Sequence, residues 1–84
     1  MTIKMSKFGK MLISRPAGKE AYLAAKAYVL PKKQEEIVLD FSEVAVLAPS
    51  WGDEFITPLK QDFPKKIKFS NTNNPSVKAT LEII

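Results

Sequence analysis

Apolar side chains in this chain recur in short runs typical of strands and in longer stretches with helical spacing. Four short segments have strand character: 2–5, 10–13, 36–41 and 66–70. The segment 36–41, EIVLDF, is a nearly continuous apolar run with β-branched residues, which is typical of a central strand covered on both faces. In the last segment, KIKFS, polar and apolar residues alternate and place Ile67 and Phe69 on one face. Gly9 supplies a turn between the first two strands.

A first helix is expected after Ser14, whose side chain can cap it. Pro16 falls in the first turn, where its missing N–H has no helical partner to lose. The alanines that follow form a broad apolar face, which predicts close packing against a sheet. Pro31 ends the helix.

A second helix is expected from Ser50, which would act as the cap and form a capping box with Asp53. Its apolar side is made by five residues: Trp51, Phe55, Ile56, Leu59 and Phe63. Pro58 conflicts with this pattern, because an interior proline removes a backbone hydrogen bond and costs roughly 3 kcal/mol. We therefore expect a kink or an early end at Pro58.

The end of the chain allows two interpretations. Asn74 and Pro75 have the character of a helix cap and first turn, but a closing strand from Ala79 is also compatible with the pattern. With a third helix there, the element order is β-β-α-β-α-β-α, and the sequence predicts one α/β domain over residues 1–84.

The order of these elements predicts where polar residues gather. Short connections between alternating strands and helices imply right-handed crossovers between parallel strands. Every strand-to-helix junction then emerges at the carboxyl edge of the sheet, where open α/β sheets bind ligands. We call this edge the rim and expect the segments ISRP, LAPSWGDE and SNTNNP to form it. The candidate partner-binding residues on the rim are Arg15, Ser50, Trp51, Asp53, Glu54, Asn71 and Asn73.

Each rim residue also has a structural interpretation. Ser50 is most simply a helix cap, and the asparagines are turn residues that tolerate unusual backbone angles. Arg15 could bind a phosphate or a partner's carboxylate, or it could pair with Asp53 or Glu54 across the rim. Trp51 either packs in the core or anchors a partner.

The composition excludes several kinds of chemistry. The 84 residues, 45% of them hydrophobic, are enough for one folded domain. The chain has no cysteine and no histidine, so we expect no disulfide, no metal or other cofactor, and no enzymatic activity. No apolar run approaches the roughly 20 residues of a membrane helix, and no signal peptide is evident. We therefore expect a cytoplasmic protein that does not bind membranes.

Charge is segregated along the chain although its sum is only +4. Residues 1–33 carry +7, residues 34–62 carry −6 and residues 63–84 carry +3. This pattern leaves an alternative open, in which the chain is a small basic protein associated with nucleic acid. The residues that would contact the nucleic acid are Lys32, Lys33, Lys65, Lys66 and Lys68.

Three segments resemble one known family. The stretches FGKMLISRPAGKEAYLAA, IVLDFSEVAVLAPSWGDEF and KIKFSNTN are similar to the STAS-like domains of unknown function found in bacteria. The most specific piece is LDF followed by a helix start of Ser, aromatic, Gly, Asp and Glu. The resemblance runs from about Phe8 to the C-terminus and implies a small STAS-like domain, with two to three helices on an approximately four-stranded mixed sheet.

The resemblance also implies a kind of function. STAS domains of the anti-sigma factor antagonist type are non-enzymatic regulators that bind a protein partner, which can be a kinase of the histidine-kinase-like, ATP-binding fold. In them a serine before the second helix is phosphorylated by that kinase. Here the equivalent position falls on or beside Pro49, and Ala48 replaces the usual acidic residue, so the pattern departs from the family. Ser50 is the only nearby hydroxyl and is the candidate phosphorylation site.

Overall fold

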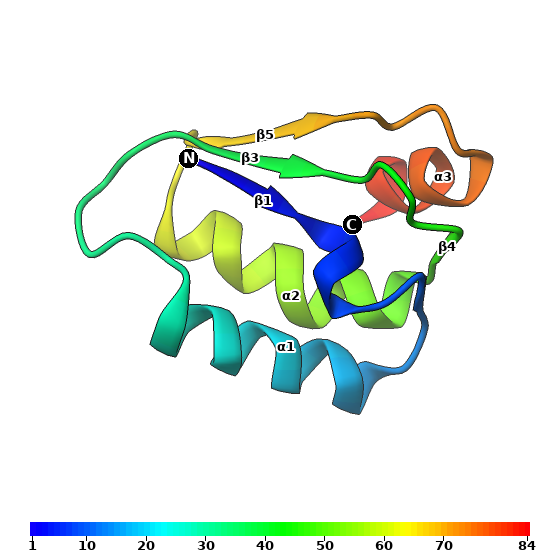
Figure 1. Cartoon of the computed structure of the whole chain (residues 1–84), viewed down its shortest axis with the longest axis horizontal. Helices are drawn as coiled ribbons and strands as arrows, with labels where there is room; N and C mark the ends of the chain where they lie inside the picture. The colour runs from blue at the N-terminus through cyan, green and yellow to red at the C-terminus, as the bar shows by residue number, and fades with distance from the viewer.

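Three helices and five strands form an α/β fold with two separate parallel sheets in the computed structural model, which describes residues 1–84 (Figure 1). The larger sheet has the order β1-β3-β5, with bounds Thr2–Lys4, Ile37–Asp40 and Ile67–Ser70. The smaller sheet pairs β2 with β4, at Met11–Leu12 and Val46–Leu47. The helices are α1, α2 and α3, at Arg15–Tyr28, Pro49–Asp62 and Pro75–Ile83. None of them is long and apolar enough to cross a membrane.

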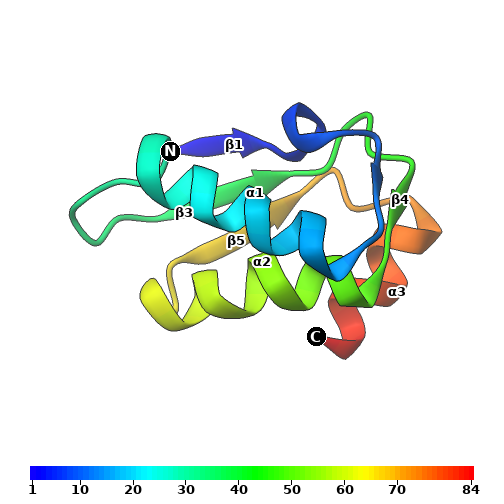
Figure 2. The same ribbon diagram turned by 90° about the horizontal axis from the view of Figure 1, so that it is seen from below.

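The two crossovers place α1 and α2 on the same face of the larger sheet, as both views show (Figures 1 and 2). This follows from the strand order, because β1 to β3 and β3 to β5 are right-handed steps in one direction. Ile3, Leu39 and Phe69 stand in one row of the register and face the helices. In β3, Ile37 and Leu39 are buried while Val38 and Asp40 are half-buried. The prediction of a strand covered on both faces is therefore wrong.

The single mixed sheet expected from the sequence is divided in two, and every strand pair is parallel. The cause is a 3-10 turn over Met5–Phe8 that separates β1 from β2 and is closed by a hydrogen bond from Gly9 N to Ser6 O. The turn carries β2 to the end of the larger sheet, where it pairs with β4. The strand β4 has only two residues, which is too short to be evident from periodicity.

The outer edge of β4 is covered by α3. Leu47 N donates to Ser76 Oγ, and Leu47 O accepts from Ser76 Oγ and from Thr80 Oγ1 at 2.5 Å. Side-chain hydroxyls thus replace a third strand and satisfy the backbone groups that β4 would otherwise bury unpaired. The smaller sheet therefore has only one open edge, on β2.

The helix boundaries confirm two predicted caps and correct one. Ser14 Oγ accepts from Ala17 N at 3.2 Å, and Asn74 Oδ1 accepts from Ser76 N and Val77 N, so residues from Pro75 form a helix rather than a strand. In contrast, α2 begins one residue before Ser50, with Ala48 at the cap position and proline first in the helix. Ser50 is therefore not a cap, and no capping box forms. The helix also continues through Pro58 to Asp62 instead of ending there.

The core lies between the larger sheet and the two covering helices. Four aromatic side chains, Phe8, Tyr22, Trp51 and Phe55, pack with ring centroids 5.0 to 6.2 Å apart. Gly18 permits α1 to approach α2 closely, since an added Cβ there would lie 2.6 Å from the carbonyl oxygen of Trp51. This contact fixes the first turns of the two helices beside each other.

Candidate functional site

The start of α1 and the second turn of α2 are joined by two exposed ion pairs. Arg15 Nη1 lies 3.1 Å from Asp53 Oδ2 and 2.6 Å from Glu54 Oε2. On the same side, Ser50 Oγ donates to Ile13 O at 2.8 Å and ties α2 to the segment that leads into α1. The predicted convergence of Arg15 and Ser50 at one edge is confirmed. Of the two interpretations of Arg15, the structure shows the pairing across the rim.

Hydrogen bonding favours the charged forms of Arg15 and Asp53. Bonds to Glu54 and then to Asp53 raise the pKa of the Arg15 guanidinium above its ordinary value. The pKa of Asp53 is lowered first by a hydrogen bond from Thr57 Oγ1, at 2.9 Å, and next by the bond from Arg15. Together with Glu54, the cluster contains one basic and two acidic side chains. Its net charge is negative, and both acidic groups are positioned by partners on α1 or α2.

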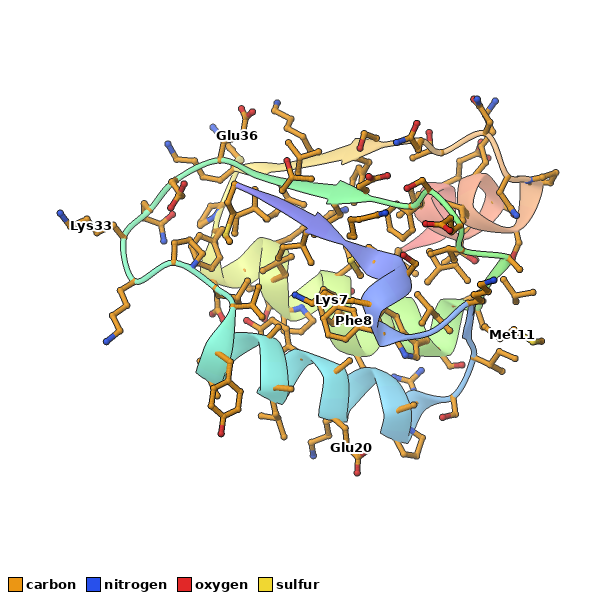
Figure 3. The ribbon with its side chains drawn as sticks, viewed as in Figure 1. Lys7, Phe8, Met11, Glu20, Lys33 and Glu36 are labelled. Atoms are coloured by element: carbon orange, nitrogen blue, oxygen red, sulfur yellow. The ribbon has the colours of Figure 1, made fainter.

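Exposed apolar side chains flank the cluster. Met11 and Ile13 keep 64% and 46% of their surface accessible, and Figure 3 shows Met11 pointing outward at this end of the molecule. Between them Leu12 is buried, as expected for alternation along a strand. Sequence reasoning assigned these residues to a strand but not to the site. The signal in the sequence that could have found them is their position on either side of Leu12, since alternate residues of a strand point to opposite faces.

The backbone of β2 is open beside these side chains. Lys10 O accepts from Val46 N, and Leu12 O accepts from Ala48 N, so these two residues face β4. Alternation then directs the N–H and C=O of Met11 away from β4, to the edge of the smaller sheet that no other strand covers. The rim thus presents an unpaired strand edge next to the charged cluster.

Trp51 does not reach the rim surface. Its side chain is only 2% exposed and stacks on Phe55 with ring centroids 5.0 Å apart and planes inclined by 16°. Of its two interpretations, the structure shows the core role. Trp51 therefore supports the site from below and offers no surface to a partner.

The loop between β5 and α3 forms a second polar group at the same end of the molecule (Figure 1). Asn71 Nδ2 donates to Asp40 Oδ1 at 2.7 Å, and this bond, followed by one from Ser42 N, lowers the pKa of Asp40. Asn71 has a φ of 55°, consistent with its predicted role as a turn residue. Asn73 is exposed. No hydrogen bond or ion pair joins this group to Arg15 or Ser50.

The five lysines of the alternative function lie away from the rim. Lys32 and Lys33 are in the loop between α1 and β3, while Lys65 and Lys66 precede β5 and Lys68 lies within it. The end of this loop meets the segment before β5, where Ile37 N donates to Lys66 O. Figure 3 shows Lys33 extended into solvent at this end of the molecule.

Comparison with known families places this α/β architecture in a defined class. The family model of the STAS-like domain of unknown function (DUF4325) matches residues 24–77, and the chain belongs to this family. The match includes Ser50, Asp53 and Glu54, whereas Arg15 lies before it. Neither the curated proteins nor the solved structures contain a match to the chain. The family is not a known enzyme family, and the STAS-like class suggests a regulatory protein-interaction module in general.

Proposed function

We propose that this chain is a non-enzymatic regulatory module that binds a protein partner through the rim. The docking surface consists of Met11, Ile13, Arg15, Asp53 and Glu54. The observation that carries the proposal is the arrangement itself: a fixed, net negative cluster lies beside two exposed apolar side chains and an open strand edge. Surfaces that combine apolar anchors with oriented charges are typical of protein interfaces.

The chemistry of this surface defines the partner. An apolar group would cover Met11 and Ile13, and lysine or arginine side chains would approach the carboxylates that Arg15 only half neutralises. The free N–H and C=O of Met11 allow an extended segment of the partner to add to β2. A kinase-like, ATP-binding protein with a basic docking face would meet these requirements.

Affinity capture with matched charge variants tests the docking surface. The tagged protein is incubated with an extract of its native host, and the captured proteins are quantified by mass spectrometry. The variant Asp53→Asn/Glu54→Gln should capture the partner several-fold less than the wild type, with an unchanged circular dichroism spectrum. The control Glu20→Gln/Glu82→Gln removes two exposed carboxylates that form no ion pair, and it should capture normally. Equal capture by both variants would contradict the proposal.

Ser50 is the proposed phosphorylation site of the module. Its hydroxyl is half-buried and is engaged with Ile13 O, so a phosphate would remove this bond and loosen the junction between the two helix starts. The N–H groups of the first turn of α2 and Arg15 would attract the phosphate, while Asp53 and Glu54 would repel it. Phosphorylation would therefore change the docking surface rather than add to it.

Intact-mass analysis after incubation with ATP and the captured partner tests this modification. One added phosphate in the wild type and none in Ser50→Ala would support it. An added phosphate that persists in Ser50→Ala would assign the modification to another hydroxyl, and no added phosphate would refute it.

A second candidate function is nucleic-acid association through Lys32, Lys33, Lys65, Lys66 and Lys68. It is favoured by the gathering of these lysines at one end of the fold, although they are separated in sequence. Binding to a generic duplex should then weaken steeply as salt is added, because phosphate contacts release counterions. Absence of binding at low salt would exclude this function.

A further inference from the structure

A pocket of about 500 Å³ lies at the end of the molecule away from the rim. It is formed by the last turn of α1, the loop that follows, and the end of α2. Its walls include Lys26, Tyr28, Leu30, Pro31, Lys32 and Phe63. Its size is that of pockets which hold small organic ligands, typically about 300–1,000 Å³.

The two lysines of this pocket are free of internal ion pairs. Asp62 also lines the pocket, but its carboxylate accepts a hydrogen bond from Tyr22 and its backbone carbonyl accepts one from Gln34 Nε2. Two lysines and one aspartate, whose carboxylate already has a partner, therefore line the pocket. The pocket has a net positive charge and favours an anionic group.

The other walls favour a ring. Tyr28 is 89% exposed, which is unusual for a large aromatic side chain, and it stands at the pocket together with Leu30, Pro31 and Phe63. Exposed aromatic rings beside lysines are platforms on which the rings of ligands stack. The sequence places Lys26, Tyr28 and Lys32 close together but does not show that Asp62 and Phe63, at the end of α2, complete the pocket.

We propose that this pocket binds a ring-bearing phosphate monoester, the chemistry of a nucleotide. The ring would lie against Tyr28 and Pro31, and the phosphate would lie between Lys26 and Lys32. A phosphate monoester carries between one and two negative charges at neutral pH, which suits two lysines. Inorganic phosphate would leave the apolar walls in water, and a neutral ring would leave the lysines without a partner. The site is independent of the partner-binding rim.

Titration followed by ¹⁵N–¹H correlation spectra tests the site. Adenosine monophosphate should cause saturable shifts at residues 26–32 and at Asp62 and Phe63. Adenosine and inorganic phosphate should each bind more weakly than adenosine monophosphate, by about tenfold or more. A 5′-phosphorylated oligonucleotide that binds more tightly than the mononucleotide would identify a strand end as the source of the group. Weaker binding of that oligonucleotide would identify the free nucleotide.

Charge variants complete the test. Lys26→Gln/Lys32→Gln should weaken binding of adenosine monophosphate by about tenfold, and Tyr28→Ala should weaken it severalfold. The control Lys19→Gln/Lys78→Gln removes two exposed lysines from elsewhere on the helices and should bind normally. Because all five substituted side chains are exposed, the variants should retain the dispersed spectrum of the folded protein.

Three results would overturn the proposal. One is the absence of saturable shifts with millimolar mononucleotide. Another is equal weakening by the two double lysine variants, which would indicate a nonspecific charge effect. The third is binding of adenosine as tight as that of adenosine monophosphate, which would remove the phosphate from the interaction. None of these results bears on the rim, where capture depends on Asp53 and Glu54.

Discussion

Gly18 is the residue at which the contact between α1 and α2 can be tested by a single methyl group. In Gly18→Ala the new Cβ would lie 2.6 Å from Trp51 O, 3.0 Å from Trp51 Cα and 3.2 Å from Glu54 Cβ. An ordinary carbon–oxygen contact is about 3.3 Å or longer, so the helices must separate locally by about 0.7 Å. Two of the obstructing atoms belong to backbone and cannot rotate away.

The magnitude follows from two opposing effects. Overpacking of this kind costs about 1–3 kcal/mol, whereas alanine in place of glycine gains up to about 1 kcal/mol of helix propensity. We expect Gly18→Ala to lower the free energy of unfolding by about 1–2 kcal/mol, and the Tm by about 5–15 °C for a domain of this size. Thermal and urea denaturation followed by circular dichroism would measure the change, and Trp51 fluorescence would report the same contact.

Gly52→Ala is the matched control. Its Cβ would lie 2.8 Å from Ile84 Cδ1 and 3.4 Å from Thr80 Cγ2, and the first of these is the far end of a flexible side chain. The substitution should leave the free energy of unfolding unchanged or raise it by up to about 1 kcal/mol. If Gly18→Ala is as stable as Gly52→Ala, the close approach of the two helix starts is refuted.

Three further predictions concern the core, a cap and a buried hydroxyl. Phe55→Ala should lower the free energy of unfolding by about 3–5 kcal/mol in urea denaturation, because this fully buried ring contacts three other aromatic side chains; a loss under about 1 kcal/mol would contradict the packing. Asn74→Ala should cost about 1–2 kcal/mol in the same assay, since the side chain caps α3 and also donates to two backbone carbonyls. Burial, and then the bond to Asp62, raise the pKa of Tyr22, so the folded state keeps the Tyr22 proton above about pH 10 while the unfolded state releases it. The wild type should therefore lose stability above that pH more steeply than Tyr22→Phe, by up to about 1.4 kcal/mol per pH unit, and equal slopes in denaturant titrations would contradict this assignment.

Local signals predicted the parts of the fold that depend on neighbouring residues. The caps Ser14 and Asn74 were evident because each precedes a proline that suits the first turn of a helix. At α2 the same rule predicts the cap two residues too late, at Ser50 instead of Ala48. Pro49 is itself the first residue of the helix, so Ser50 lies inside it and its hydroxyl turns to Ile13 instead.

Other parts depend on contacts between distant segments. The strand β4 has two residues and is stabilised by hydroxyls from α3, about thirty positions later in the chain, so no local pattern could reveal it. The α2 helix continues through Pro58 because neighbouring side chains, including Phe55 and Leu59, are buried in the core and offset the lost hydrogen bond. Helix propensity alone does not include this compensation.

The candidate site was predictable in its charges and not in its apolar part. The crossover argument placed Arg15 beside Asp53 and Glu54 because it required only the order of the elements. It could not show that β2 leaves the main sheet and exposes Met11 and Ile13, since that depends on the 3-10 turn before it. The crossover argument also could not decide between the two interpretations of Trp51. Whether the helix face that carries this residue is buried or exposed depends on how the neighbouring sheet packs against it.

The proposed docking surface requires that the first turns of α1 and α2 lie side by side in solution. A nuclear Overhauser spectrum of the isotopically labelled protein tests this requirement directly. We predict cross-peaks between the Hα atoms of Gly18 and Trp51, and between the side chain of Ser50 and Ile13. A spectrum of the folded protein that lacks both contacts would show that the two helix starts are apart, and the docking surface would not exist.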